Sequence, residues 1–342
     1  MPKTVAVVPG DGAGKEVIPQ AVDTLRALGA DLELREYDVS ADRYLATGVS
    51  LDEQTFTDLK SADAILFGAV GDPRVDEHYA ASILLRIRFE MDLYANLRPA
   101  RLFDDRLSPL RDGGRRSVDL LVVRENTEGV YVGLGGRFKR GTAGEIAIQE
   151  DVNTFAGVTR ILEHAFTHAR REVCMVDKSN AMGFAGGLWQ TCWKTVSARH
   201  AEMMTRHLYA DACAMELVRD PSQFDVIVTG NLFGDLLSDL TAQLVGGMGV
   251  APSANLNPET GRALFEPVHG SAPTIAGQNI VNPIGAILSS AMMLAHLGMA
   301  AEAEKVERAV VSAIHAGETT RDLGGSLGTR EAGEAIRRRL RD

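Results

Sequence analysis

The chain has 342 residues, with 36 Lys and Arg against 46 Asp and Glu, and a formal charge of −10. At roughly 150 residues per domain this length predicts about two domains, and a hydrophobic fraction of 45% excludes a disordered chain. The acidic balance argues against nucleic acid or an anionic membrane as the main partner, because both attract basic surfaces.

Neither a membrane span nor a disulfide framework is expected. The most apolar stretch, residues 286–301, is shorter than the roughly 20 residues of a span and contains two serines and a histidine, which predicts a buried core helix. The N-terminal apolar run is too short for a signal peptide. Cys174, Cys192 and Cys213 lack CxxC spacing, which favours reduced thiols in the core of a cytoplasmic protein.

Strand-like and helix-like segments alternate along the chain, as the apolar spacing indicates. Strands are predicted at residues 4–8, 31–35, 64–68, 118–123, 172–176 and 225–229, and helices at residues 15–28, 51–61 and 82–94. This alternation predicts an α/β class with buried, largely parallel strands. Residues 111–117 are predicted to form a loop, and residues 246–257 a long turn-rich connection and candidate domain crossing.

The first loop, residues 10–15 (GDGAGK), lies between a predicted strand and a predicted helix, where backbone N–H groups can hold a phosphate. It lacks the third glycine of the dinucleotide fingerprint, and Gly14-Lys15 is followed by Glu16 rather than by Ser or Thr. A phosphate-binding loop and a tight structural turn therefore both remain open.

Three arginines stand at the ends of predicted elements or next to them. Arg88 lies in a predicted helix, Arg98 follows it in the segment NLRP, and Arg124 ends an apolar strand. A guanidinium beside a buried strand requires an anion. The pattern predicts a site for carboxylates held by paired hydrogen bonds, and separate surface salt bridges are the alternative.

Asp235 and Asp239 are four residues apart in NLFGDLLSD, on a predicted helix, so both carboxylates project from one face. Like charges at this spacing repel unless a cation joins them, and Mg²⁺ or Mn²⁺ suits oxygen ligands. Asp211, an acid among apolar neighbours, is a candidate third ligand, while a solvated helix face is the alternative. Lys178 follows a predicted strand and is a candidate base if a nearby dication lowers its pKa.

Together these segments resemble the β-decarboxylating dehydrogenases of the isocitrate/3-isopropylmalate dehydrogenase family. The segments that match are residues 9–14, 68–73, 92–99, 123–131, 177–180, 225–240 and 265–283, and NLFGDLLSD and FEPVHGSAP are the most specific. The resemblance implies the two-domain α/β fold of that family rather than an ordinary Rossmann fold. Residues 1–98 and 251–342 would form a large cofactor-binding domain. Residues 99–250 would form a small domain with the metal and catalytic residues and the interface of a homodimer with shared active sites.

The resemblance also implies how substrate and metal bind. A malate-like di- or tricarboxylate would be bound by Arg88, Arg98, Arg124 and Asn180. Mg²⁺ or Mn²⁺ would be held by Asp235 and Asp239 of one subunit and Asp211 of the other. The metal would acidify the substrate's 2-hydroxyl, Lys178 of the partner would take its proton as hydride passes to the nicotinamide, and Tyr131 would help to protonate C3 after CO₂ leaves.

For the cofactor, the resemblance implies contacts from Gly12, Ala13, Glu266, His269, Gly270, Ser271, Ala272 and Asn282. NAD-using relatives usually carry Asp at the position of Thr274, whereas NADP-using relatives tend to carry Lys followed by Tyr, where this chain has Ile275. An acid there repels the 2′-phosphate of NADP, but Thr274 has no charge with which to do so. The expectation is a preference for NAD with weakened exclusion of NADP.

The helix before Arg88 would border the substituent on C3 of the substrate through Leu84 and Leu85. These leucines resemble the 3-isopropylmalate and D-malate/tartrate enzymes, whereas Ala81 replaces an acid common in the isopropylmalate pocket. We expect 3-isopropylmalate or a similar 3-alkylmalate, then D-malate or tartrate, then isocitrate or homoisocitrate. A catalytically inactive regulatory subunit of the same fold is disfavoured, because Lys178, Tyr131 and all three candidate metal ligands are present.

Overall fold

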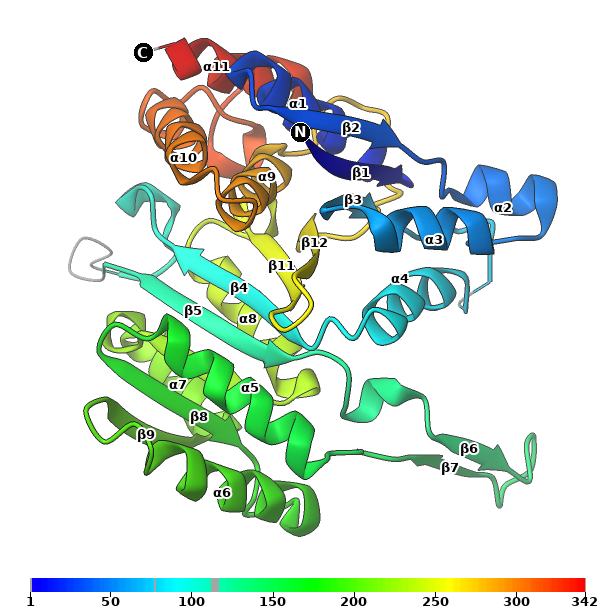
Figure 1. Ribbon diagram of the computed structural model, residues 1–342, viewed down its shortest axis with the longest axis vertical. Helices are drawn as coiled ribbons and strands as arrows, with labels where there is room; N and C mark the ends of the chain where they lie inside the picture. Colours follow the sequence, from blue (N-terminus) through cyan, green and yellow to red (C-terminus); the bar gives the residue numbers. More distant parts are fainter. Residues whose placement is uncertain (1, 77, 112–116, 342) are drawn as a thin grey trace.

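The structure, a computed structural model, describes residues 2–76, 78–111 and 117–341 (Figure 1). Most of the loop predicted at residues 111–117 therefore lies outside the described residues. The strands are β1 Lys3–Gly10, β2 Leu32–Glu36, β3 Ala64–Ala69, β4 Ala95–Arg101, β5 Asp119–Glu125, β6 Gly135–Phe138, β7 Ile146–Gln149, β8 Glu172–Asp177, β9 Met204–Tyr209, β10 Val226–Thr229, β11 Pro252–Asn257 and β12 Arg262–Pro267. The helices are α1 Gly14–Leu28, α2 Ala41–Thr47, α3 Glu53–Ser61, α4 His78–Glu90, α5 Phe155–His168, α6 Gly183–Ser197, α7 Ala210–Arg219, α8 Asn231–Leu244, α9 Ile284–His296, α10 Ala300–His315 and α11 Thr329–Arg338.

Ten of the described strands form one sheet in the order β2-β1-β3-β12-β11-β4-β5-β10-β8-β9. The pairs at both ends of this order are parallel, as predicted. The three central pairs, from β12 through β11 and β4 to β5, are antiparallel. The α/β prediction is thus confirmed, and the antiparallel centre joins two parallel halves. Strands β6 and β7 form a separate hairpin that extends away from the body of the molecule (Figure 1).

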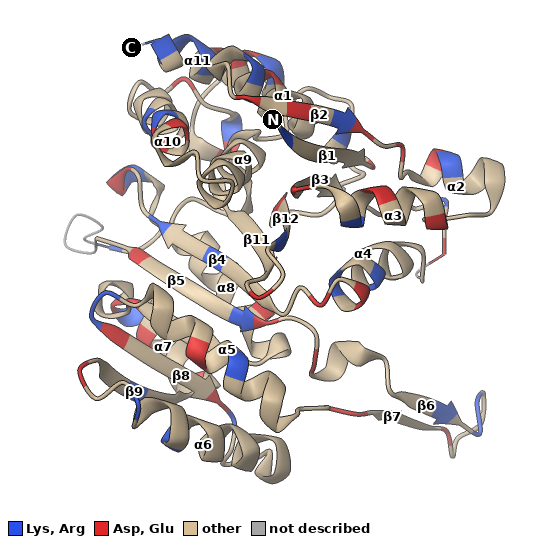
Figure 2. Ribbon diagram, in the orientation of Figure 1, with Lys and Arg blue, Asp and Glu red and all other residues tan. Residues whose placement is uncertain are grey.

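Helices cover both sides of the sheet because inner strands such as β1, β3, β8 and β10 carry buried apolar side chains on both faces. One apolar cluster joins β1 and β3 to α3 and α4, and includes Phe56, Tyr79 and Ile83. A second and larger cluster joins the rest of the sheet to α1, α5, α6, α9 and α10. On α2, α3, α4 and α10 acidic and basic residues are interspersed, so these outer helices carry charge of both signs (Figure 2).

The predicted connection at residues 246–257 is wrong in its second half, where β11 runs through the centre of the sheet. Pro252 and two asparagines have low strand propensity, but β11 is paired on both sides, with β4 and β12. Tertiary pairing therefore overrides local preference. The helix predicted at residues 82–94 instead spans His78–Glu90, and Asp92 just beyond it has a positive φ of 50°.

The apolar segment at residues 286–301 forms the buried helix α9, which ends at His296. All three cysteines are free and buried, as predicted. Within the described ranges, no helix combines the length and the apolar character that a membrane crossing demands.

Candidate active site

The three predicted arginines meet at one open cavity with an empty volume of about 980 Å³. Arg88 comes from the last turn of α4, Arg98 from β4 and Arg124 from the end of β5. All three side chains are more than 90% buried. The alternative of separate surface salt bridges is therefore wrong.

Arg124 is held by the first turn of α8. Asn231 Oδ1 accepts hydrogen bonds from its Nε and Nη2 at 3.0 and 2.8 Å, and Asp235 accepts from Nη1. The guanidinium also stacks over the Tyr131 ring, 5.4 Å from its centroid. Burial and the charges of Arg98 and Arg88 lower the pKa of Arg124 to about 10, so it stays charged at neutral pH.

Arg98 lies in the middle of the cluster. Its Nη1 donates to Ser238 Oγ at 3.1 Å and to Asp239 Oδ1 at 3.4 Å, and its Nε donates to Asn96 Oδ1 at 2.9 Å. Burial, and then the charge of Arg88, lower the pKa of Arg98. Three guanidinium groups thus line one cavity, which suits a ligand with several carboxylates.

Arg88 forms one ion pair, from Nη2 to Glu266 Oε1 at 2.9 Å. Its Nε is buried and has no hydrogen-bond partner in the structure. An unpaired buried donor is costly, and Arg88 is one of the residues that line the cavity. This guanidinium is the least satisfied of the three.

Asp235 and Asp239 project from one face of α8 beside Arg98, as predicted. Burial opposes ionisation of Asp235, but the charges of Arg124 and Arg98 outweigh it and hold its pKa below the usual range. Burial and the neighbouring charge of Asp235 raise the pKa of Asp239. Two adjacent half-buried carboxylates with this mutual repulsion fit a hard divalent cation.

Asp211 and Lys178 form an ion pair with each other, at the start of α7 and the end of β8. Lys178 Nζ lies 5.8 Å from the centroid of the Tyr209 ring. Among the described residues, no group of three His, Cys, Asp or Glu side chains could hold a metal ion, so one subunit does not bring Asp211 to Asp235 and Asp239. The arginine cavity and the Lys178 pair are two separate parts within one chain.

Leu84 and Leu85 line the arginine cavity next to Arg88, together with Ala80 and Ala81. Arg86 points elsewhere, because it pairs with Glu53 and Glu90 and covers the Phe56 ring. The wall that α4 contributes beyond Arg88 is therefore apolar. Asn180, a predicted substrate residue, is exposed in the turn after β8.

The glycine loop and the segment that follows β12 lie against each other. Ala13 N donates to Ser271 O at 2.7 Å, and Gly12 packs against the same carbonyl with a positive φ of 50°. Most N–H groups of this loop donate within the protein, since Asp11 N bonds Ala69 O and Gly14 N bonds Asp11 O. These bonds favour the structural-turn interpretation of the loop.

The remaining predicted cofactor residues have different surroundings. His269 and Gly270 line the arginine cavity, and Asn282 Nδ2 donates to Asp322 Oδ2 at 2.9 Å. Ala272 has a positive φ of 41°, and Thr274 and Ile275 are exposed at the surface. Glu266 has a contact that the sequence did not predict, because it pairs with Arg88.

A family profile described as isocitrate/isopropylmalate dehydrogenase matches residues 4–336. The chain belongs to this family. It is 44% identical over 338 residues to the 3-isopropylmalate dehydrogenase of Corynebacterium urealyticum, covering 97% of this chain and 98% of that one. It is 47% identical over 328 residues to the 3-isopropylmalate dehydrogenase of Leifsonia xyli subsp. xyli, covering 91% of each. The crystal structure of isocitrate dehydrogenase from Methylococcus capsulatus matches with a TM-score of 0.92 at 34% identity, covering 99% of this chain and 100% of that one.

The predicted family and its fold are thereby confirmed. Several polar residues of the site were missed by sequence reasoning, namely Asn96, Asn126, Asn231, Ser238 and Asn255. Four of them are asparagines in or beside buried strands, and a buried amide requires hydrogen-bond partners. Asparagines in predicted strands could therefore have indicated a buried polar network, since asparagine is uncommon in strand interiors.

Proposed function

We propose that this protein catalyses the metal-dependent oxidative decarboxylation of 3-isopropylmalate, or of a similar 3-alkylmalate, to a 2-oxo acid and CO₂ with reduction of NAD. The observation that carries this proposal is a cavity lined by three buried arginines and by the apolar residues that α4 adds next to Arg88. Relatives named 3-isopropylmalate dehydrogenase, 42–47% identical to this chain, support the same reaction.

The charged and the apolar lining of the cavity match the carboxylates and the alkyl group of such a substrate. The guanidinium groups bind the carboxylates through charge-assisted hydrogen bonds. Leu84 and Leu85 then face the substituent on C3, where an alkyl group removes their surface from water. A third carboxylate at C3, as in isocitrate, would lose water there and gain no partner from Ala80, Ala81 or the leucines.

The proposal also assigns roles to the candidate metal ligands, to Lys178 and to Tyr131. Asp235 and Asp239 hold Mg²⁺ or Mn²⁺ together with the partner's Asp211, and the bound ion supplies Lewis-acid stabilisation of negative charge on substrate oxygen. Lys178 of the partner subunit accepts the proton of the 2-hydroxyl. The Tyr131 hydroxyl, 3.1 Å from Asp235 Oδ2, delivers a proton to C3.

The cofactor in this proposal is NAD, bound along residues 266–282 beside the glycine loop. Thr274 can donate a hydrogen bond to the adenosine ribose but carries no charge to repel a 2′-phosphate. We therefore expect measurable but lower kcat/KM with NADP than with NAD. Equal values, or a preference for NADP, would contradict this part of the proposal.

A homodimer is also part of the proposal, because the two halves of the site lie apart in one chain. Large apolar side chains are exposed around these halves, with Met215 on α7 at 70%, Leu236 on α8 at 60% and Phe184 on α6 fully exposed. The β6–β7 hairpin exposes Phe138, Ile146 and Ile148 in the same way. Such surfaces suit a two-fold interface with a second copy of the chain.

The proposal is tested with the purified protein, Mg²⁺ and NAD, by following NADH formation with a panel of 2-hydroxy acids. We expect the highest kcat/KM with 3-isopropylmalate, about tenfold or more above D-malate, since each buried methylene contributes about 1–3 kcal/mol. Isocitrate should be poorer still. Removal of the metal with EDTA should abolish turnover, and added Mn²⁺ should restore it.

The panel also separates the alternatives. A higher kcat/KM with D-malate or tartrate, or with isocitrate or homoisocitrate, would replace the proposed substrate within the same reaction class. Absence of turnover with every acid, in a protein that still binds NAD, would indicate a regulatory subunit.

A further inference from the structure

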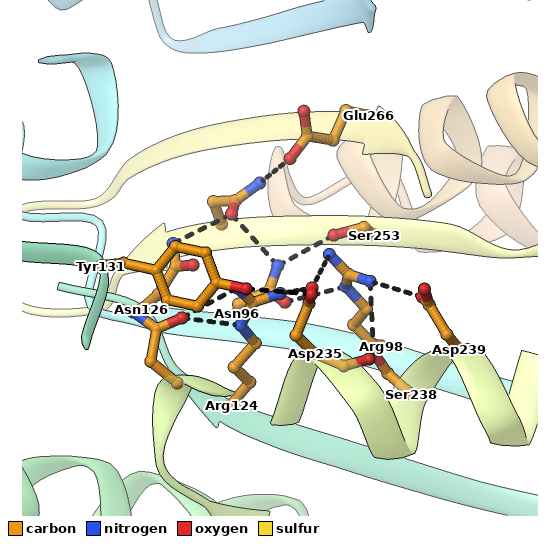
Figure 3. A network of polar contacts seen from close by, with 12 residues as sticks. Asn96, Arg98, Arg124, Asn126, Tyr131, Asp235, Ser238, Asp239, Ser253 and Glu266 are labelled. Atoms are coloured by element: carbon orange, nitrogen blue, oxygen red, sulfur yellow. Dashed lines mark hydrogen bonds and ion pairs between the residues drawn. The ribbon is translucent and has the colours of Figure 1, made fainter. Parts of the chain in front are cut away.

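Arg98 and Arg88 are joined inside the protein by an unbroken series of hydrogen bonds, and Figure 3 shows the part of it from Arg98 to Glu266. Arg98 Nε donates to Asn96 Oδ1 at 2.9 Å, and Asn96 Nδ2 donates to Asn255 Oδ1 at 3.1 Å. Asn255 Nδ2 then donates to Glu266 Oε1 at 2.9 Å, and that oxygen also accepts from Arg88 Nη2 at 2.9 Å. Both asparagines are fully buried.

The register of the sheet creates this chain. Asn96 of β4 stands directly opposite Asn255 of β11, and Arg98 is two residues from Asn96, so the three side chains share one face. Glu266 belongs to β12, the next strand, where it stands opposite Ser253. The chain thus crosses the three antiparallel strands that join the parallel halves of the sheet.

The direction of every hydrogen bond in this chain is determined by its ends. An arginine can only donate and a carboxylate only accept, so each amide must present its oxygen toward Arg98 and its nitrogen toward Glu266. Asn126 Nδ2 also donates to Asn255 Oδ1, at 3.0 Å, which fixes the orientation of that amide a second time. Neither Asp nor Leu at position 255 offers both an acceptor and a donor.

Glu266, at the end of this series of hydrogen bonds, determines how many N–H groups of Arg88 are hydrogen-bonded within the protein. Glu266 Oε1 is shared between Arg88 and Asn255, and Glu266 makes a single bond to Arg88 through Nη2. Arg88 Nε is buried and has no hydrogen-bond partner in the structure. Released from Asn255, Glu266 could turn and form a two-bond fork with Arg88, which is the preferred geometry of an arginine–carboxylate pair.

We propose that Asn255 is a positioning residue that restrains Glu266 and so keeps Arg88 available to a substrate carboxylate. Asn96 completes the restraint, because it orients the Asn255 amide and ties it to Arg98. This inference rests on the proposed function in that Arg88 and Arg98 bind one substrate. It adds a reason for three buried amides in the centre of the sheet.

The test compares Asn255→Leu with Asn257→Leu, using 3-isopropylmalate, Mg²⁺ and NAD. Asn257 is a matched control because it is a buried asparagine of the same strand whose amide donates to Asp92 outside the network. We expect Asn255→Leu to raise the KM for 3-isopropylmalate roughly tenfold, the effect of about one lost hydrogen bond. Its KM for NAD is measured in parallel, because Glu266 is also an expected cofactor contact. Asn257→Leu should lower the melting temperature comparably and leave both KM values near those of the wild type.

A double-mutant cycle tests the mechanism itself. If Asn255 acts by restraining Glu266, then Asn255→Leu should have little further effect on the substrate KM in a Glu266→Gln background. Additive effects of the two substitutions would overturn the proposal. Asn255→Ala, which removes the donor and adds no bulk, replaces Asn255→Leu throughout if the leucine variant does not fold.

Two outcomes separate this inference from the proposed function. If wild-type protein does not oxidise 3-isopropylmalate, the proposed substrate fails, and the same KM comparison is made with the best acid of the panel. If the wild type is active but Asn255→Leu and Asn257→Leu change the substrate KM equally, the role of Asn255 is structural and the inference is wrong.

Discussion

At the scale of single residues, the cavity gathers three cations in a chain that is acidic as a whole. The protein has a net charge of −10, yet Arg88, Arg98 and Arg124 line one cavity. Asp235, Asp239 and Glu266 form ion pairs with these arginines, and the Nε of Arg88 has no hydrogen-bond partner. Net charge describes the surface, whereas the ligand responds to the local field.

A second residue-scale feature lies away from the cavity, on α5. His164 and His168 are half-buried, with their Nε2 atoms 3.2 Å apart. Burial, and then the charge of His168, lower the pKa of His164 to about 4, and burial lowers the pKa of His168. Because the unfolded chain takes up these protons near pH 6.5 and the native state does not, stability should fall as the pH drops from about 6.5 toward 4.

His164→Asn should flatten this pH dependence. The wild type should lose stability by about 1 kcal/mol or more per pH unit below pH 6 relative to the variant. Urea unfolding at pH 5.0, 5.5, 6.0 and 7.5 measures it, and the difference at pH 7.5 gives the cost of the substitution itself. Parallel stability curves for the two proteins would show that His164 does not carry the effect.

At the scale of elements, helix α8 arranges most of the site. Asn231, Asp235, Ser238 and Asp239 recur at helical spacing on one face, and each contacts Arg124 or Arg98. The helix can approach this closely because Gly234 has no side chain. A Cβ built at Gly234 would lie 2.5 Å from Cγ of Arg124.

Gly234→Ala should therefore displace Arg124. Overpacking against a buried guanidinium should cost about 1–3 kcal/mol and raise the substrate KM. Gly187→Ala on α6 is the control, since a Cβ there meets nothing within 4 Å and Ala favours a helix over Gly by about 1 kcal/mol. Melting temperature and steady-state kinetics measure both. An unaltered KM in the Gly234 variant would mean that Arg124 tolerates the shift.

At the scale of the whole molecule, one chain holds an incomplete site. Asp235 and Asp239 face the arginine cavity, while Asp211 pairs with Lys178 elsewhere. A two-fold dimer that joins one half from each subunit makes two equivalent complete sites. The separation of the halves is thus a reason for the proposed oligomeric state.

Mixed dimers test this arrangement. Lys178→Ala should abolish NAD reduction and leave dimerisation intact, and Arg124→Lys should strongly reduce activity through the other half of the site. Equal amounts of the two variants, unfolded and refolded together, should regain about a quarter of the wild-type activity, because half of the dimers then hold one intact site of two. Light scattering checks the dimer. If activity does not return although mixed dimers form, Lys178 acts within its own subunit.

The sequence by itself determined the family, the α/β class and the approach of Asp235 to Asp239, because these follow from motifs and from periodicity along one segment. The division into domains at residues 98 and 250 stays a prediction, since one continuous sheet passes through both parts.

Only the tertiary structure decided that residues 252–257 form a central strand, that N–H groups of the glycine loop donate within the protein, and that Asn96 stands opposite Asn255. Strand pairing brings residues together that are far apart in the sequence, and no local pattern encodes the partner. The amide chain between Arg98 and Arg88 exists because β4, β11 and β12 are adjacent in this register. The effect that we propose for these amides on substrate binding therefore depends on how the strands of the sheet are paired.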